Sequence, residues 1–211
     1  MTIAPTTEES TTSSTIEPSV PSTIESNTTG PTIMTTTVPT TTSIQSQNGL
    51  QLQVSVNATD ISPGEAFQIR ISEYNMLASS NTVSAEKNWG VNGLALGFCA
   101  NIYVQPFGVA VCQGYYTAHN ILQATPLKIF MPGVCPNYII LITGYVFLPH
   151  SIYADILPGS TPTAGTLMSA NVTVDGIYTN GTQSSPLNPG VYTIVAGDEW
   201  GTLGLIYVTV E

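Results

Sequence analysis

Apolar and polar residues alternate one by one along several stretches of the chain. Residues 50–57 show the pattern most clearly (Leu-Gln-Leu-Gln-Val-Ser-Val-Asn), and residues 67–72 repeat it after a Ser-Pro-Gly-Glu turn at 62–65. A period of two is typical of a strand that buries one face. Both stretches are therefore predicted to be half-buried strands.

Short apolar runs bounded by Pro, Gly and Asn continue to the C-terminus. Residues 138–148 are apolar on both faces and predict a central strand, whereas residues 188–210 predict a final hairpin around a Gly-rich acidic turn. Residues 76–90 are polar and predict a loop. No apolar repeat of 3.6 residues lasts three turns, so the chain is predicted to be an all-β, antiparallel β-sandwich. Its other expected strands are 94–98, 108–116, 127–130, 151–157 and 168–175.

The first 47 residues differ in composition from the rest. They contain 24 Ser or Thr and 5 Pro, but no Lys, Arg or aromatic residue. Such a segment cannot bury enough apolar surface to offset the entropy of ordering it. We therefore expect a disordered, glycosylated tether over residues 1–48 and a folded domain over residues 49–211. An alternative is that residues 32–39, which are rich in β-branched side chains, add a strand to the open edge of a neighbouring subunit.

Charged side chains are scarce, at 8% of the chain against about 25% in ordinary soluble proteins. The net charge is −10, and the three cations are Arg70, Lys87 and Lys128. This balance disfavours nucleic acid and anionic membranes as partners, because both need clustered Lys or Arg. A chain with few ionisable groups loses little stability when it is acidified, so we expect a protein adapted to strongly acidic surroundings. No apolar run reaches the roughly 20 residues of a membrane-spanning helix.

Three cysteines, Cys99, Cys112 and Cys135, allow one disulfide and one free thiol. Cys99 and Cys135 stand beside loop signals. Cys112 stands in an apolar strand, where a free cysteine commonly behaves as a small buried hydrophobe. The expected disulfide is therefore Cys99–Cys135. A Cys99–Cys112 bond that closes a hairpin, or three reduced thiols, are the alternatives.

Four Asn-X-Ser/Thr sequences are candidate N-glycosylation sites: Asn27, Asn57, Asn171 and Asn180. Asn27 belongs to the tether and Asn180 to an Asn-Gly turn, so both are expected to be exposed. Asn57 and Asn171 fall near the ends of predicted strands. Several such sequences arise by chance in a chain this rich in Asn and Thr, so their placement is more informative than their number.

Tests for catalytic and cofactor motifs are mostly negative. His119 and His150 are the only histidines, and no cysteine is followed closely by the His and Met of a cupredoxin copper site. Metalloprotease, serine-hydrolase and phosphate-loop motifs are absent from the sequence. We therefore predict no catalytic residue, no metal and no cofactor.

The turn of the last hairpin contains the adjacent acids Asp198 and Glu199, followed by Trp200. Adjacent acids in an extended segment point apart, so they make a poor acid–base pair, and Asp198 is expected to bond backbone amides of the turn. A Ca²⁺ site would need further oxygen ligands, and Asp155 and Asp175 are the unplaced candidates. Trp200 either folds inward to cap the core or, with the two acids, forms an exposed contact loop.

Several short motifs in residues 49–211, taken together, carry a resemblance. They are Pro-Gly-Glu at 63–65, Gln-Gly-Tyr-Tyr at 113–116, Cys-Pro at 135–136, Pro-Gly-Val-Tyr-Thr at 189–193 and Ala-Gly-Asp-Glu-Trp-Gly at 196–201. The combination resembles immunoglobulin-like modules of secreted and cell-surface proteins from thermoacidophilic archaea. That resemblance implies an immunoglobulin-like β-sandwich of about seven to nine strands and a tyrosine corner at Tyr192, whose hydroxyl bonds upstream backbone. It also implies a role in surface structure or adhesion, without catalytic residues.

The sequence thus predicts a non-catalytic structural or adhesion module of the cell surface or extracellular space. Its expected partners are other copies of itself, neighbouring surface proteins or glycans. Residues 1–5 lack the basic and apolar regions of a signal peptide, so we expect that a signal or anchor has been removed. One alternative is a filament subunit whose N-terminal segment completes a neighbour's sheet. Another is a hydrolase accessory domain that binds carbohydrate through Trp200.

Overall fold

The computed structural model describes most of the chain from residue 40 onward. In this part of the chain no helix is long and apolar enough to cross a bilayer. The described residues are 40–45, 48–86, 90–91, 94–95, 99–100, 103–104, 106–127, 143–157 and 166–211.

Sheet A is antiparallel and carries the clearest alternation of the sequence. Every second residue of β2 is buried, and the residues between them are half-buried, which confirms the predicted pattern. β4 buries Phe67, Ile69 and Ile71 in the same way. In spatial order the sheet contains β1 (Thr40–Gln45), β2 (Leu50–Val56), β4 (Phe67–Asn75) and β14 (Ser169–Val174).

Sheet B contains the predicted final hairpin. β17 and β18 pair antiparallel from Gly190↔Val210 to Gly197↔Leu203, and β10 pairs along the other side of β17. A two-residue strand, β3, runs parallel to the end of β18. The order is β10 (Phe107–Gln113), β17 (Gly190–Asp198), β18 (Leu203–Val210) and β3 (Asp60–Ile61).

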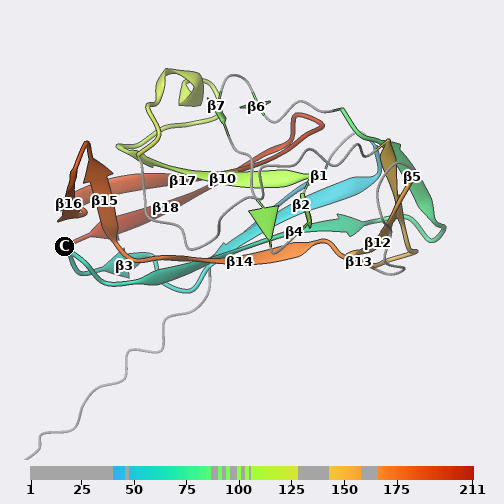
Figure 1. The fold of residues 1–211 in the computed structure, drawn as a ribbon, viewed down its shortest axis with the longest axis horizontal. Helices are drawn as coiled ribbons and strands as arrows, with labels where there is room; N and C mark the ends of the chain where they lie inside the picture. Colours follow the sequence, from blue (N-terminus) through green and yellow to red (C-terminus); the bar gives the residue numbers. More distant parts are fainter. Residues whose placement is uncertain are drawn as a thin grey trace, which may run out of the picture. The chain divides into compact units, whose positions relative to one another are not determined.

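Sheets A and B lie one above the other and enclose the main core (Figure 1). The inward faces of β2, β4, β14, β17 and β18 supply most of its apolar side chains. At Gly204 the two layers approach so closely that an added Cβ would stand 2.9 Å from the side chains of Ile44 and Val54. The architecture is therefore all-β and consistent with a β-sandwich, as the sequence predicts.

Sheet C covers one end of this core (Figure 1). Its strands contribute Val83, Tyr145, Phe147 and Ala154 to the same cluster of buried residues. β5 lies within the stretch 76–90 that the sequence predicted to be a loop, so that prediction is wrong there. The order is β13 (Thr166–Leu167), β12 (Tyr153–Ile156), β11 (Gly144–Phe147) and β5 (Asn81–Ser84).

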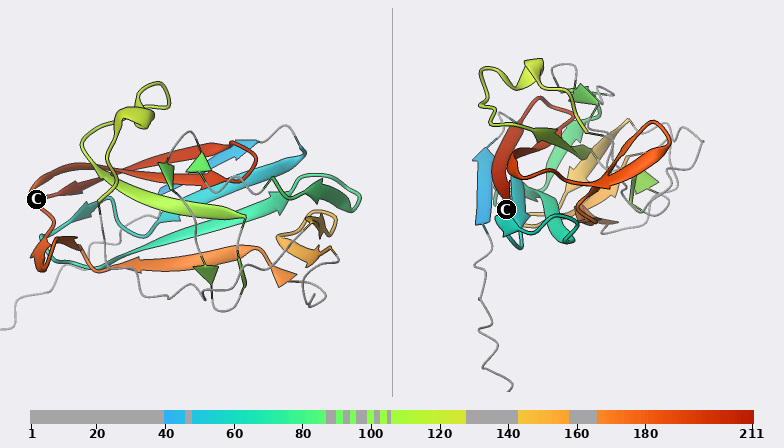
Figure 2. Two further views of the ribbon diagram at one scale, coloured as in Figure 1. Left: turned by 45° about the horizontal axis from the view of Figure 1, so that its top comes forward. Right: turned by 90° about the vertical axis from the view of Figure 1, so that its left-hand side faces the viewer.

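β1 corrects the predicted domain boundary, because it lies inside residues 1–48. It pairs antiparallel with β2 from Thr40↔Val56 to Gln45↔Gln51. It also lies beside β18, and the hydroxyl of Thr42 donates to the carbonyl of Leu205 (3.3 Å). Figure 2 shows β1 in blue at the side of the two layers. Its polar Thr-Thr-Thr-Ser sequence looks like tether, yet backbone pairing requires no apolar side chains.

The remaining elements are short. One 3₁₀ turn, Ile121–Gln123, follows β10. The Asn-Gly turn predicted near residue 180 joins one antiparallel pair, with Gly181 at φ +67. The two-stranded pairs are β6 (Gly90–Val91) with β7 (Leu94–Ala95), β8 (Cys99–Ala100) with β9 (Tyr103–Val104), and β15 (Ile177–Asn180) with β16 (Gln183–Pro186).

Candidate functional site

The turn between β17 and β18 is folded against the core. Asp198 and Glu199 are only 1% and 5% exposed. Oδ1 of Asp198 accepts hydrogen bonds from the backbone N–H groups of Trp200 (2.9 Å) and Thr202 (2.7 Å). Gly201 completes the turn at φ +92, a conformation that favours glycine. The predicted role of Asp198 in bonding the turn is confirmed.

A third acid, Glu73 of β4, joins this turn inside the protein. Glu73 is fully buried, and its backbone N–H donates to the carbonyl of Met168 (3.0 Å). Its carboxyl group lies against that of Asp198, and the charge of Glu199 also acts on it. Residues 73, 198 and 199, called the acid cluster below, therefore bring together two sheets at one buried place.

The environment of the acid cluster favours a protonated carboxyl group. Burial raises the pKa of Glu73 well above its ordinary value, and the negative charges of Asp198 and Glu199 raise it further. Burial also raises the pKa of Asp198, although hydrogen bonds from Thr202 and Trp200 stabilise its anion. Burial and the neighbouring anions thus favour the protonated form of Glu73. Two carboxylates side by side could not hydrogen bond to each other, because both only accept.

Two aromatic side chains surround the acid cluster. The hydroxyl of Tyr145 hydrogen bonds with Glu199, and burial together with this acid raises the pKa of Tyr145. The rings of Tyr145 and Trp200 meet edge to face, with centroids 5.8 Å apart. Nε1 of Trp200 donates to the carbonyl of Ser84 in β5 (2.9 Å). The turn of sheet B is thus tied to two strands of sheet C.

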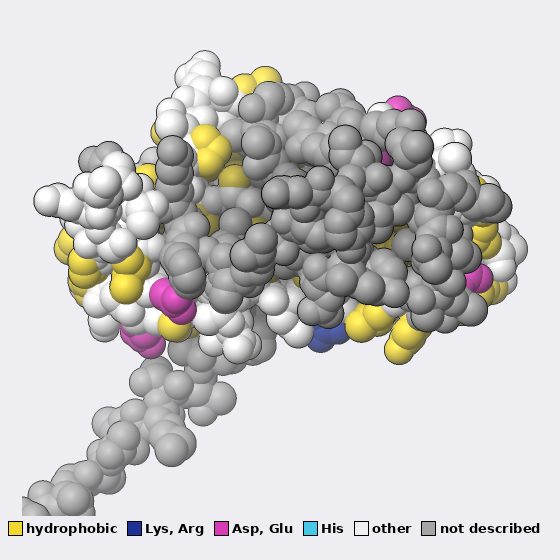
Figure 3. Space-filling view, viewed as in Figure 1, with side chains coloured by type: hydrophobic (Ala, Val, Ile, Leu, Met, Phe, Trp, Pro, Cys, Tyr) yellow, Lys and Arg dark blue, Asp and Glu magenta, His cyan; other side chains and the backbone are white. Residues whose placement is uncertain are grey.

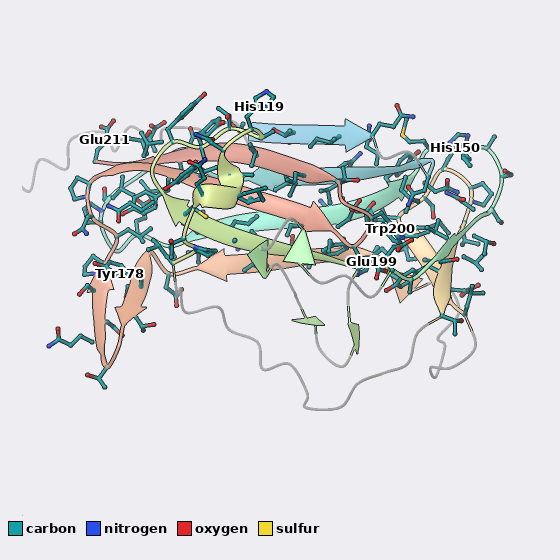
Figure 4. The ribbon with its side chains drawn as sticks, turned by 90° about the horizontal axis from the view of Figure 1, so that it is seen from above. His119, His150, Tyr178, Glu199, Trp200 and Glu211 are labelled. Carbon is teal, nitrogen blue, oxygen red and sulfur yellow. The ribbon has the colours of Figure 1, made fainter. Side chains whose placement is uncertain are left out.

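This geometry decides between the two predictions for the turn. Trp200 is partly buried against the main core, so the inward alternative is confirmed. The exposed contact loop of Asp198, Glu199 and Trp200 is wrong, because both acids are buried and the turn is held inward by the amide bonds to Asp198 and by the bond from Trp200 to Ser84. Figure 4 shows Glu199 and Trp200 at the opposite end of the sandwich from Tyr178 and Glu211.

The described residues contain no group of three His, Cys, Asp or Glu arranged to hold a metal ion. Asp155 lies on β12 and Asp175 follows β14, and neither of them is among the groups that shift the pKa of Glu73 or Asp198. Figure 4 also shows His119 and His150 far apart. What the acid cluster offers chemically is a buried environment that favours a protonated carboxyl group.

Cys112 is a buried, free thiol in β10, as the sequence predicted. The alternative Cys99–Cys112 disulfide is therefore wrong. Burial raises the pKa of Cys112 to about 11. The side chain of Cys99 and the whole of Cys135 lie outside the described residues, so the Cys99–Cys135 disulfide stays a prediction.

The candidate glycosylation sites fall at different kinds of position. Asn57 is exposed after β2, but its Oδ1 accepts a hydrogen bond from the N–H of Gln68 (2.7 Å). Asn171 is exposed on β14, and Asn180 ends β15 just before its turn. Asn27 lies outside the described residues. Glycosylation at all four stays a prediction.

The outer face of sheet A has a hollow of about 270 Å³ near its middle. Arg70 stands in it, directly between Ser55 of β2 and Asn171 of β14 in the strand register. Arg70 is exposed and forms no hydrogen bond or ion pair with a described residue. Thr41, Gln53, Ser72 and Ile152 also line the hollow.

Glu73 was not among the predicted site residues, although the sequence contains a signal for it. The alternation Phe67, Ile69, Ile71 continues to Glu73 and Asn75, so both were due to face inward. Asn75 is fully buried, and its Nδ2 donates to the carbonyls of Ser79 (3.0 Å) and Leu148 (2.9 Å). A polar residue at an inward position of a strand is the pattern to search for.

No protein-family model, curated protein or solved structure matches this chain. Its function is therefore argued from its own residues.

Proposed function

We propose that the chain is a non-catalytic structural or adhesion module of an extracellular or cell-surface protein, with an immunoglobulin-like β-sandwich on a Ser/Thr/Pro-rich tether. The immunoglobulin-like assignment is supported by Tyr192, whose buried hydroxyl donates to the carbonyl of Asn188 (2.8 Å). A tyrosine bonded to backbone a few residues upstream is typical of a tyrosine corner.

The observation that carries the structural role is β1. The Ser/Thr-rich segment passes directly into an edge strand of sheet A, which pairs with β2 over six residues. A tether attached through a strand ladder is held by several backbone hydrogen bonds at once. It is therefore suited to carry load between the domain and whatever it is attached to.

The surface supports a contact role based on uncharged polar groups. In Figure 3 the described surface is mostly uncharged polar or hydrophobic, with few Asp or Glu and very little Lys or Arg. The Arg70 hollow adds one unpaired cation among hydroxyl and amide side chains. Such a face can contact neighbouring surface proteins or glycans through hydrogen bonds.

Location and contact are tested separately. Immunogold labelling of intact cells of the source organism, with antibody against the folded domain, is expected to decorate their surface. Labelling confined to the cytoplasm of sectioned cells would contradict the proposal.

For the contact face, Arg70→Gln is expected to weaken binding of the purified protein to whole cells, whereas Glu86→Gln, at another exposed site, is expected to leave that binding unchanged.

A second candidate function, that of a filament subunit, is favoured by the position of β1 beside β18. The half-buried side chains of β1, Thr42 and Ile44, face β18 and the seam between sheets A and B. A β1 strand from a neighbouring copy would fit the same place, as in strand exchange between subunits.

Two matched deletions distinguish the candidates by electron microscopy. If strand exchange builds a filament, the native chain and the chain lacking residues 1–39 form polymers, whereas the chain lacking residues 1–47 does not. Monomers from all three chains would contradict the filament, and the tethered module would remain as the proposed function.

A further inference from the structure

The acid cluster lies at a junction of the fold. Glu73 comes from sheet A, whereas Asp198 and Glu199 come from the hairpin turn of sheet B. The same turn reaches sheet C through Trp200 and Tyr145, and the N–H of Glu199 donates to the carbonyl of Pro106, just before β10 (2.8 Å). A change in the charge of this cluster therefore acts on all three sheets.

Glu73 is unusual in how little else it contacts. It is fully buried, and neither of its carboxyl oxygens accepts a hydrogen bond from a described residue. Oδ2 of Asp198 is also buried and has no hydrogen-bond partner among the described residues. Such an arrangement is very costly for two anions but tolerable for an acid–carboxylate pair.

The groups that face Glu73 are acidic or apolar. Its partner in β2 is Leu52, and its backbone contact before β14 is Met168. The turn contributes Asp198 and Glu199, and β11 contributes Tyr145, which hydrogen bonds with Glu199. β10 places Phe107 opposite Asp198. Arg70, the cation that the structure describes on β4, is exposed on the other face of sheet A.

We propose that the acid cluster is a proton lock on the β17–β18 turn. With a proton between Glu73 and Asp198, the turn is held in the core and Trp200 caps sheet C. When that proton is lost, two buried carboxylates repel each other, the turn moves out, and Trp200 becomes exposed. The device does not depend on where the protein works or on what it contacts.

The direction of the pH effect follows from linkage. Burial raises the pKa of Glu73 and that of Asp198, so the folded state holds its proton more tightly than the unfolded chain does. The stability from this proton is fully present below the unfolded-state pKa, and it is lost as pH rises through the folded-state pKa. The lock therefore closes in acid and opens toward neutral and alkaline pH.

Thermal unfolding between pH 3 and pH 9 tests the lock in the full chain. The native Tm is expected to fall by roughly 5 °C or more as pH rises. Glu73→Gln keeps the shape and can still donate to Asp198, but it has no proton to lose. Its Tm is expected to change little with pH and to exceed the native Tm at the alkaline end. Glu86→Gln, on an exposed acid, is expected to keep the native profile.

Two independent readouts complete the test. In a Trp89→Phe background, Trp200 fluorescence is expected to shift to the red and become quenchable as pH rises. If Glu73→Gln does not fold, infrared spectra of the native protein are expected to show a protonated carboxyl persisting at pH 7. A native Tm that is flat or rises with pH would overturn the lock. A rise is the result expected if the acids instead pair as anions with Lys87 or Lys128. A Glu73→Gln profile that follows the native one would overturn it too.

Discussion

Asp198 is the residue on which the last turn depends. One of its oxygens accepts two backbone N–H groups, and the carboxyl group also lies beside that of Glu73. Side chains with two such functions are poorly replaced by apolar residues of similar size, because the buried amides lose their acceptor.

Two substitutions separate these functions. Asp198→Asn and Asp198→Ala both remove the charge, but only Asn retains an acceptor for Trp200 and Thr202. Asp198→Ala is therefore expected to be about 2 kcal/mol less stable than Asp198→Asn in denaturant unfolding. Equal stabilities would mean that the two amide bonds contribute nothing to the fold.

Cys112 gives a second prediction at this scale. Because burial raises the pKa of its thiol to about 11, the thiolate fraction at pH 8 is about one thousandth. Cys112 is expected to resist iodoacetamide in the folded protein and to react quickly in denaturant. Peptide mass mapping without reduction tests the predicted disulfide in the same sample, and it should show Cys99 linked to Cys135. Rapid labelling of Cys112 in the native chain would contradict its burial.

Residue roles were predictable from the sequence where they are local. The bond from Asp198 to its own turn needs only nearby amides, and the bond from the Tyr192 hydroxyl to the carbonyl of Asn188 joins residues four positions apart. The partnership of Glu73 with Asp198 joins residues 125 positions apart in the sequence, on different sheets. Alternation could place Glu73 inside, but it could not say which side chain would meet it there.

At the scale of elements, alternation succeeded wherever a strand buries one apolar face. β2, β4 and β14 were predicted in this way, and so was the final hairpin. The sequence failed at β1 and β5, which contain few apolar residues and depend on backbone pairing with β2 and β11. Propensity and burial carry little information about such strands.

The position of β1 predicts where a protease stops. The composition of residues 1–39 favours cleavage, whereas Thr40–Gln45 is held in a ladder with β2. Limited proteolysis followed by mass spectrometry is therefore expected to leave a stable fragment that begins near Thr40. A fragment that begins after residue 47 would show that β1 does not stay paired with β2 in solution. It would then support the predicted domain boundary at residue 49.

Removing β1 is expected to have a cost that removing the preceding residues does not have. A chain that starts at Thr40 should have the Tm of the full chain. A chain that starts at Asn48 exposes the edge of β2 and the side chains beside Gly204, so its Tm should be lower by several degrees. Identical values for the two truncated chains would argue that β1 adds nothing to the domain.

At the scale of the whole molecule, the three larger sheets share one core. The same cluster of buried side chains includes Leu52 of sheet A, Ile194 of sheet B and Tyr145 of sheet C. Because charged side chains are scarce in the sequence, this core and the backbone ladders are expected to be the principal sources of stability. A domain organised in this way should lose its sheets together.

Trp200 can report whether that is so, because it lies where sheets B and C meet. In a Trp89→Phe background at pH 4, where the lock is expected to be closed, Trp200 fluorescence and far-ultraviolet circular dichroism are expected to give one coincident unfolding transition. At pH 8 the lock predicts that the fluorescence change comes first, since the turn leaves before the sheets separate. Separate transitions at pH 4 would show instead that sheet C unfolds independently of sheets A and B. With the lock closed at this pH, repulsion between the acids could not be the cause of that separation.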